Sequence, residues 1–286
     1  MQNTNSGIHH LSVGGSTVTA LNDLVFEAGT GVVAGIPSEE AETILRGNFR
    51  RMPARISVSA FLVTLGGQHI LVDSGVGANM GGGQVRPRLS RLGIDPSAIR
   101  TVLITHAHVD HVSGLIDEHG GAYFPNAEIV MHEAEAGHWL DEQKAAAAPE
   151  AAKGSFAIAQ AALAPYRNRL KLVKDGQEGV PGIRAQHFPG HTPGHSGWLL
   201  EQGNDALLIW GDIVHLPGLQ FRQPKAGMVF DTDVELARST RARVFDMATA
   251  DKLRVCGMHL DFPAFGHVVK ASEGYHFIPE VWMPTA

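Results

Sequence analysis

The stretch "THAHVDHVSG", residues 105–114, carries three histidines and one aspartate within six positions. It follows "IRTVLI", residues 99–104, an apolar run that predicts a buried strand, so we expect the motif on a loop at the strand's carboxyl end. Imidazole nitrogens and carboxylate oxygens together suit a divalent ion such as zinc. Because His106 and His108 alternate along an extended loop while Asp110 and His111 point elsewhere, this one loop can serve two metal centres.

Two ions need about four ligands each, so the loop requires partners from distant segments. Three strand ends offer them: "PGHTPGH" supplies His191 and His195, "LLIWGD" ends at Asp212, and "LRVCGMH" ends at His259. A lone histidine is usually a structural or surface residue, but polar groups that each follow an apolar strand favour a metal site. Spacing alone does not choose between His191 and His195.

The segment "HEAEAGH", residues 132–138, does not match the zinc-protease pattern HExxH, because its second histidine falls at position i+6. We therefore expect His132 and His138 to be ordinary surface residues. No spacing signal accompanies six other histidines, His9, His10, His69, His119, His187 and His276.

The formal net charge of the 286-residue chain is −6, and Cys256 is its single cysteine. This charge provides no basic stripe for phosphates, so nucleic acid is not an expected partner and small or neutral substrates fit better. One cysteine cannot form an internal disulfide, which is compatible with the cytoplasm. The N-terminal stretch "MQNTNSGIHHLSVGG" lacks a signal-peptide pattern, and no run approaches the ~18 apolar residues of a membrane span. Unless a leader has been trimmed from the sequence, we expect a cytoplasmic protein without a membrane partner.

Strand and helix patterns alternate along the chain. Apolar and β-branched runs predict strands at residues 16–26, 56–65, 68–73, 99–106, 127–133, 183–188, 195–203, 205–212 and 252–259. Helical patterns cover residues 37–47, 84–94, 134–143, 151–163 and 234–250. Strands dominate each half with helices between them, which favours two sheets with outer helices over a doubly wound parallel sheet. Without a repeat or a linker, we expect one domain over residues 1–286.

On these residues the sequence resembles the metallo-β-lactamase superfamily, whose HxHxDH motif His106, His108, Asp110 and His111 match in full. The resemblance implies an α/β fold, an αββα sandwich of two mixed β-sheets with helices on the outer faces. It also implies two divalent metal ions. Zinc is the expected metal, although manganese, cobalt and iron accept the same donors.

The resemblance further implies three ligands for each ion and one bridging carboxylate. The first ion takes His106, His108 and His191, the second takes Asp110, His111 and His259, and the bridge is Asp212. His195 then supports the ligands without binding metal. Asp73 in "LVDSG" is implied to orient a ligand histidine, although an Asx turn that closes a strand explains Asp73 equally well.

Within the superfamily, the chain looks most like the branch of methyl parathion hydrolase and the lactonases, over nearly its whole length. The similarity lies in "WGDIVHLPGLQF", residues 210–221, and in "HLDFPAFGHV" and "GYHFIP" within residues 259–279. His108 stands where the oxygen- and nitric-oxide-reducing branch usually has a glutamate, which argues against redox chemistry. The nuclease branch would need a basic substrate face, which the net charge does not provide.

The branch resemblance places aromatic side chains around the leaving group. Trp139 and Phe156 are the first candidates for this substrate pocket, and Phe221 and Phe265 are weaker ones. The alternative, that these are core aromatics, fits the sequence about as well.

His215 lies three residues after the bridging aspartate, where the familiar homoserine lactonases have a tyrosine. It would donate a hydrogen bond to the leaving oxygen, orient the substrate, or simply line the pocket. This departure means that the tyrosine mechanism of those enzymes does not transfer directly.

The resemblance implies a dinuclear hydrolase that cleaves a lactone or another carboxylic ester, with activated phosphotriesters as side substrates. A hydroxide shared by ions ~3.5–4 Å apart would attack the carbonyl, and Asp110 would orient it and pass its proton to the leaving oxygen. Two alternatives stay open, a dedicated organophosphate hydrolase and a metal-stabilised binding protein that has lost turnover. Dimers are common in this branch, so a homodimer is a further expectation.

Overall fold

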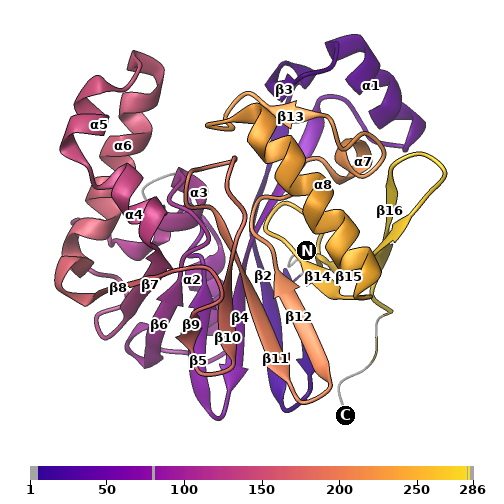
Figure 1. The fold of residues 1–286 in the computed structure, drawn as a ribbon. Helices are drawn as coiled ribbons and strands as arrows, with labels where there is room; N and C mark the ends of the chain where they lie inside the picture. The colour runs from indigo at the N-terminus through magenta and orange to yellow at the C-terminus, as the bar shows by residue number, and fades with distance from the viewer. Residues whose placement is uncertain (1–5, 79–80, 282, 284–286) are drawn as a thin grey trace, which may run out of the picture.

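The computed structural model describes residues 6–78, 81–281 and 283. Within this part of the chain, two seven-stranded sheets lie face to face (Figure 1). The first sheet has the order β1-β2-β4-β5-β6-β7-β8, antiparallel from β1 to β5 and parallel from β5 to β8. Its strands are β1 (Ile8–Val13), β2 (Ser16–Ala28), β4 (Ala54–Leu65), β5 (Gln68–Val72), β6 (Ile99–Leu103), β7 (Glu128–His132) and β8 (Leu170–Val173).

The second sheet has the order β16-β15-β14-β12-β11-β10-β9 and is also mixed, because β12 and β14 are parallel while the other pairs are antiparallel. Its strands are β9 (Glu178–Val180), β10 (Ile183–His187), β11 (Ser196–Gln202), β12 (Asp205–Ile209), β14 (Arg254–Cys256), β15 (Phe265–Lys270) and β16 (Tyr275–Pro279). A small ribbon pairs β3 (Val33–Ala34) with β13 (Gly227–Met228).

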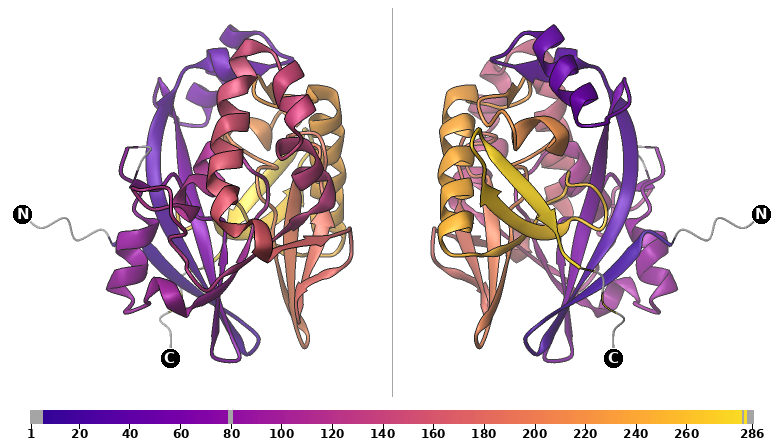
Figure 2. Two further views of the ribbon diagram at one scale, coloured as in Figure 1. Left: turned by 90° about the vertical axis from the view of Figure 1, so that its left-hand side faces the viewer. Right: turned by 90° about the vertical axis from the view of Figure 1, so that its right-hand side faces the viewer.

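The helices are α1 (Ser38–Gly47), α2 (Val85–Arg91), α3 (Val109–Val112), α4 (Glu133–Trp139), α5 (Glu142–Ala147), α6 (Glu150–Leu163), α7 (Pro217–Gln220) and α8 (Val234–Ala250). Helices cover the outer faces of both sheets, with α2, α4 and α6 on the first and α8 on the second. The side views in Figure 2 place α2 outside the first sheet and α8 outside the second. The predicted αββα sandwich is therefore confirmed. Among the described residues, no helix has the length and apolar character needed to cross a membrane.

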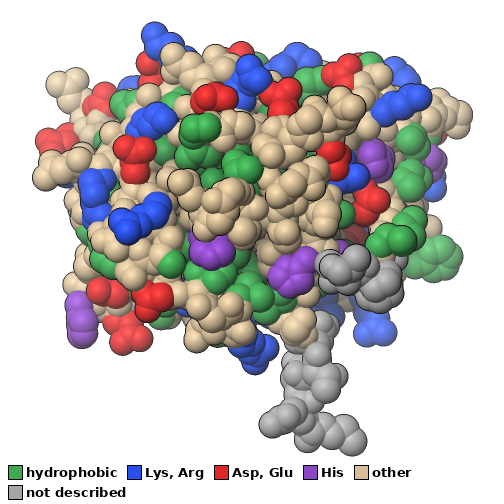
Figure 3. Space-filling model, turned by 90° about the horizontal axis from the view of Figure 1, so that it is seen from below, with side chains coloured by type: hydrophobic (Ala, Val, Ile, Leu, Met, Phe, Trp, Pro, Cys, Tyr) green, Lys and Arg blue, Asp and Glu red, His purple; other side chains and the backbone are tan. Residues whose placement is uncertain are grey.

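Alternation along β4 explains why the first sheet is buried on both faces. Phe61 and Val63 belong to the core that the two sheets share, whereas Ala60 and Leu62 pack with α2 and α6 on the outer side. Successive side chains of a strand point to opposite faces, so this apolar run fills two layers at once. On the face seen from below in Figure 3, acidic and basic side chains are interspersed.

Several element boundaries differ from the sequence prediction. The helix expected at residues 134–143 is two helices, because α4 ends at Trp139 and the Asp141 side chain caps α5 by accepting from the Gln143 N–H at 2.8 Å. The last predicted strand, residues 252–259, is shorter, since β14 ends at Cys256 and the rest is a loop. Strands β1, β8, β9 and β16 carry no clear sequence signal and form as neighbours of stronger strands.

The carboxyl ends of the central strands gather the candidate ligands at one edge of the sandwich. β6 leads into the loop that holds His106 and His108, β10 is followed by His191, and β12 and β14 are followed by Asp212 and His259. Parallel strands present their carboxyl ends on the same side, so residues distant in sequence meet there.

Candidate metal centre

The first cluster at this edge consists of three histidine rings. The His106 Nε2 atom lies 3.1 Å from His108 Nδ1 and 3.1 Å from His191 Nε2, and His108 Nδ1 lies 3.0 Å from His191 Nε2. Three nitrogens thus converge on one point from two loops that lie 85 residues apart. Together they form a group with the geometry to hold a metal ion.

A second cluster consists of Asp110, His111 and His259. The Asp110 Oδ2 atom lies 3.6 Å from His111 Nε2 and 3.5 Å from His259 Nε2. Asp110 and His111 belong to the short helix α3, which starts directly after His108, and the His111 ring lies 3.9 Å from the His106 ring between centroids. The motif therefore faces two clusters because the chain changes from extended loop to helix within it.

Asp212 stands between the two clusters. Its Oδ2 atom lies 3.0–3.5 Å from five histidine Nε2 atoms, those of His259, His215, His191, His111 and His106. The buried Asp212 thus faces both clusters with one carboxylate, the arrangement that a bridging ligand requires.

Buried acceptors fix the outer nitrogens of these rings. His111 Nδ1 donates to Asp73 Oδ2 at 2.7 Å, and His191 Nδ1 donates to Asp231 Oδ1 at 2.8 Å. His259 Nδ1 donates to the Ser57 carbonyl at 2.7 Å. Each bond directs the Nε2 atom of its ring into the centre. Asp73 also accepts from the Thr105 N–H at 2.8 Å, so it joins the end of β5 to the motif loop.

His195 has a different environment from His191. Its Nδ1 donates to the Phe188 carbonyl at 2.9 Å, and its Nε2 accepts from the Asp212 backbone N–H at 2.8 Å. Burial lowers the pKa of His195 to about 3, so the ring is neutral as this bonding requires. Among the described residues, His195 joins no metal-binding cluster, and it positions Asp212 through the backbone.

Sequence reasoning missed Glu135, a fully buried carboxylate on α4. Its Oε1 accepts from the Ala107 N–H at 2.8 Å and from Trp139 Nε1 at 2.6 Å. Its Oε2 accepts from the Thr192 hydroxyl at 2.6 Å and from the Gly194 N–H at 2.9 Å. Asp231 was missed as well. Neither Glu135 nor Asp231 belongs to a recognisable sequence motif, because each contacts the site from a segment outside the HxHxDH motif.

The donor set fits a pair of divalent cations. Burial lowers the pKa of His106 and of His108 well below the usual range, with help from neighbouring histidines, so these rings are neutral and offer lone pairs. Burial raises the pKa of Asp212, but the histidines around it, His111 foremost, more than offset this and hold the pKa well below its usual range. Lone pairs that converge around a charged carboxylate call for a cation.

Three further atoms support this fit. His111 Nε2, Asp212 Oδ1 and His215 Nδ1 are buried and form no hydrogen bond with any described residue. Buried polar atoms are normally paired, so unpaired ones at a cluster of donors indicate a missing partner. Burial opposes protonation of His191, yet Asp212 and Asp231 raise its pKa to about 9, so a proton or a metal ion balances their charge.

A pocket of about 440 Å³ opens over the centre. One wall is apolar and comes from β2, β4 and the loop after β5. Its residues are Leu24, Phe26, Ile56, Val58 and Val76. Val109, Phe230 and Ser155 also line it, beside the polar residues His108, Asp110, His191, Asp212, His215 and His259. Such a cavity accommodates a small substrate with an apolar chain.

The four aromatics predicted for the substrate pocket lie behind it or elsewhere. Trp139 and Phe156 are buried on α4 and α6, and Trp139 contacts the His108 ring edge-on at 5.5 Å between centroids. Phe221 stacks on Phe245 at 5.1 Å and Phe265 packs against Phe61 at 5.6 Å, both in the core. None of the four lines the pocket, and the aromatics that do are Phe26 and Phe230.

His132 also differs from its expected place on the surface. It is buried, its Nδ1 accepts from the Ala134 N–H at 3.2 Å, and its ring stacks on His187 at 4.0 Å with an interplanar angle of 8°. His132 is thus the N-cap of α4. The mismatch with the HExxH pattern excluded a zinc-protease site, but it did not predict whether His132 is buried.

Comparison with known proteins identifies the class. A family model of the metallo-beta-lactamase superfamily matches residues 53–259. Together with the fold and the seven clustered side chains, this match shows that the chain belongs to the metallo-β-lactamase superfamily, and the resemblance inferred from the sequence is confirmed.

Two curated relatives are lactonases. An N-acyl homoserine lactonase of Bacillus sp is 28% identical over 194 residues, 67% of this chain and 65% of that protein. The N-acyl homoserine lactonase of Bacillus cereus is 27% identical over the same length. The matched region spans slightly under two thirds of these relatives.

Solved structures cover nearly the whole chain. The hydrolase AbOPH of the beta lactamase superfamily is 31% identical with a TM-score of 0.92, covering 97% of this chain and 99% of that one. AidC, a dizinc quorum-quenching lactonase solved with the product N-hexnoyl-L-homoserine, is 26% identical with a TM-score of 0.88 at the same coverage. Lactonases and a hydrolase are thus the proteins that this chain is similar to.

Proposed function

We propose that this protein is a hydrolase that uses two zinc ions to open a lactone or to cleave another carboxylic ester. The observation that carries the proposal is the position of Asp212 Oδ2, within 3.0–3.5 Å of five histidine Nε2 atoms from the segments that follow β6, β10, β12 and β14. The dizinc lactonase AidC and the Bacillus lactonases support the metal and the reaction class.

Seven residues would hold the two ions. His106, His108 and His191 would bind the first, Asp110, His111 and His259 the second, and Asp212 would bridge them. When bound, such ions lower the pKa of a water toward neutrality and polarise a carbonyl oxygen. The protein's own part is to fix the rings through Asp73, Asp231 and the Ser57 carbonyl.

Asp110 is the carboxylate suited to proton transfer. Its side chain is 19% exposed and lines the substrate pocket, whereas that of Asp212 is 2% exposed. Asp110 can therefore accept a proton from an attacking water and deliver it to the leaving oxygen within the pocket.

His215 would orient the substrate as a neutral ring. Burial lowers the pKa of His215 to about 4, against the opposing effect of Asp212. A neutral imidazole at neutral pH donates one hydrogen bond and does not deliver a proton as a strong acid. Its Nε2 lies 3.1 Å from Asp212 Oδ2 at the edge of the pocket, where the tyrosine of related lactonases is expected.

The apolar wall of the pocket supports a substrate with an acyl chain. Phe26 and Phe230 are 41% and 38% exposed, so they present apolar surface at the pocket to a ligand. Burial of that surface favours long-chain over short-chain lactones, since each buried methylene contributes about 0.8 kcal/mol.

The test combines metal analysis with a substrate panel. Purified protein would be assayed for zinc content and for hydrolysis of N-acyl homoserine lactones, dihydrocoumarin, aryl esters and paraoxon-type phosphotriesters. We expect two zinc ions per chain and the highest kcat/KM on a lactone or ester. A preference for phosphotriesters would favour the organophosphate hydrolase instead, and two bound ions without hydrolysis of any compound would favour a binding protein.

A further inference from the structure

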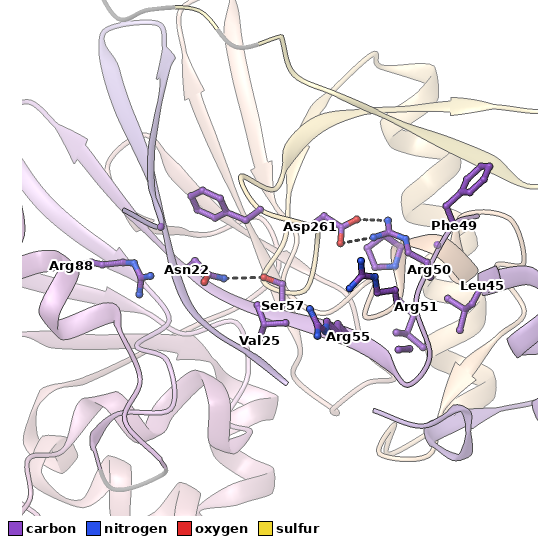
Figure 4. A pocket seen from close by; sticks show the side chains of 16 residues that line it. Asn22, Val25, Leu45, Phe49, Arg50, Arg51, Arg55, Ser57, Arg88 and Asp261 are labelled. Carbon is purple, nitrogen blue, oxygen red and sulfur yellow. Dashed lines mark hydrogen bonds and ion pairs between the residues drawn. The ribbon is translucent and has the colours of Figure 1, made fainter. Parts of the chain in front are cut away.

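A second cavity lies across strands β2 and β4 from the substrate pocket. Its volume is about 520 Å³, against about 440 Å³ for the substrate pocket, and the two share no lining residue. Four arginines line it, Arg50, Arg51, Arg55 and Arg88, and we call it the arginine pocket (Figure 4). The metal site and its supporting carboxylates do not use these arginines.

Alternation along β4 separates the two cavities. Ile56 and Val58 line the substrate pocket, while Arg55 and Ser57 line the arginine pocket. Because successive side chains of a strand point to opposite faces, one stretch of β4 forms a wall of both. The arginine pocket is therefore a separate site that shares a partition with the metal centre.

The lining carries four arginines and one carboxylate, in a chain whose formal net charge is −6. Among the described residues of its lining, the one carboxylate is Asp261, which forms two hydrogen bonds with Arg50, one of them at 2.9 Å. Arg55 lies 3.4 Å from Glu27 in an exposed pair, and Arg51 forms no hydrogen bond or ion pair with any described residue. Guanidinium groups stay charged at all relevant pH values.

Apolar residues form part of the wall as well. Leu45, Val25 and Phe262 line the cavity, and Phe49 stands at its edge (Figure 4). The Phe49 side chain is 96% exposed and its backbone adopts a φ of 60°, a conformation that is uncommon for phenylalanine. A strained and fully exposed aromatic beside a charged cavity is a feature that a ligand would cover.

The geometry points to a binding site for an amphipathic organic anion, with a carboxylate or phosphate head held by Arg51 and Arg55 and a short apolar tail against Val25 and Phe262. Arginine forks match the planar oxygens of such heads and form charge-assisted hydrogen bonds with them. Carboxylic acids released by ester or lactone hydrolysis belong to this class of anion. Only for these acids does the inference rest on the proposed hydrolase function.

An occupant would contact the supports of the metal centre. The Ser57 carbonyl holds His259 Nδ1 at 2.7 Å, and Asn22 Nδ2 donates to the Ser57 hydroxyl at 3.0 Å on the side of the arginine pocket. Asp261, the partner of Arg50, lies two residues after His259 in the same loop. We therefore expect an anion bound in the arginine pocket to change kcat. An anion that competes with the substrate at the metal centre would raise only the apparent KM.

The experiment measures binding to the zinc-loaded protein by isothermal titration calorimetry with octanoate, hexyl phosphate and the neutral alcohol octan-1-ol. The test variant is Arg51→Ala/Arg55→Ala. The control is Arg100→Ala/Arg167→Ala, which removes the same charge from two exposed arginines outside the cavity. Binding of anions at the metals contributes equally to all three proteins, so the difference between variants reports the arginine pocket.

We expect one of the two anions to bind the wild type and the control alike, and to bind the test variant at least about tenfold more weakly. The tighter head group identifies a carboxylate or a phosphate as the natural ligand. Equal affinity in the test variant, binding of octan-1-ol as tight as that of octanoate, or no binding of either anion would overturn the proposal. These outcomes do not depend on turnover, so they are distinct from failure of the proposed hydrolase activity.

Discussion

Glu135 and Gly194 connect the two ligand loops of the first cluster. Glu135 Oε2 accepts the Gly194 N–H at 2.9 Å while its Oε1 accepts the Ala107 N–H at 2.8 Å, between His106 and His108. A Cβ atom at Gly194 would lie 2.0 Å from the backbone nitrogen of Glu135, so only glycine allows this approach. One buried carboxylate therefore sets the distance between the motif loop and the loop of His191.

Glu135→Gln should weaken metal binding. Four donors converge on the Glu135 carboxylate, and an amide would turn its NH₂ group toward two of them. We expect zinc affinity, measured by competition with a chelator, to fall about 10- to 100-fold because the outer shell no longer holds the ligand loops. Glu133→Gln, an exposed residue of the same helix, is the control and should retain wild-type affinity.

Asp110→Asn tests the proton-transfer role. The amide keeps the shape of the side chain but cannot take up a proton, so we expect kcat on lactones to fall about 10²- to 10⁴-fold. Zinc content is measured in parallel, because Asp110 is also a proposed ligand. Near wild-type turnover with two bound ions would show that Asp110 does not move the proton.

His215→Phe removes a hydrogen-bond donor from the pocket while retaining a planar ring. We expect two zinc ions to remain bound and kcat to fall about 10²-fold, the usual cost of losing one donor to a developing oxyanion. His215→Tyr should restore part of the activity, since a phenol also donates. An unchanged kcat in His215→Phe would leave His215 as a lining residue only.

Phe26→Ala tests the apolar wall. Phe26 is 41% exposed at the pocket, so its removal takes away contact with a long acyl chain but not with the lactone ring. We expect kcat/KM for a ten-carbon acyl lactone to fall about tenfold and that for a four-carbon lactone to change little. Leu172→Ala removes a 50% exposed apolar side chain on β8 and serves as the control. Equal losses on both substrates would contradict an acyl-binding wall.

The sequence predicted the metal ligands where they lie close together in the chain or directly after an apolar strand. The motif at residues 105–114 places His106 and His108 on extended chain and Asp110 and His111 on α3, so one short segment supplies ligands to both clusters. Strand ends marked by Asp212 and His259 could be found because each follows an apolar run. The choice of His191 over His195 needed the family resemblance, and the structure shows that the two differ by their partners, Asp231 and Phe188.

The rest depends on tertiary packing that no local pattern records. Glu135 and Asp231 act through hydrogen bonds to other segments, so their role has no periodicity. The sequence prediction assigned Phe221 and Phe265 to the pocket because they follow ligand segments in the chain. In the structure both side chains are buried in the core. A single domain over residues 1–286, a homodimer and a cytoplasmic location stay predictions.

The His132 ring should make folding stability sensitive to mild acid. Burial, and then the neighbouring His187, lower the pKa of His132 from its ordinary value of 6.5. The unfolded chain therefore binds a proton at a pH where the folded protein does not, so the free energy of unfolding falls as pH drops below about 6.5. Above that value both states are neutral at this residue and the contribution is fully present.

His132→Asn isolates this effect, because asparagine can still cap α4 but does not titrate. We expect urea denaturation between about pH 7.5 and about pH 5 to show a smaller loss of stability on acidification in this variant than in the wild type. His276→Asn removes an exposed histidine and should keep the wild-type slope. If all three proteins lose stability at the same rate, His132 is not an acid-sensitive element of the fold, and the titration lies in other groups.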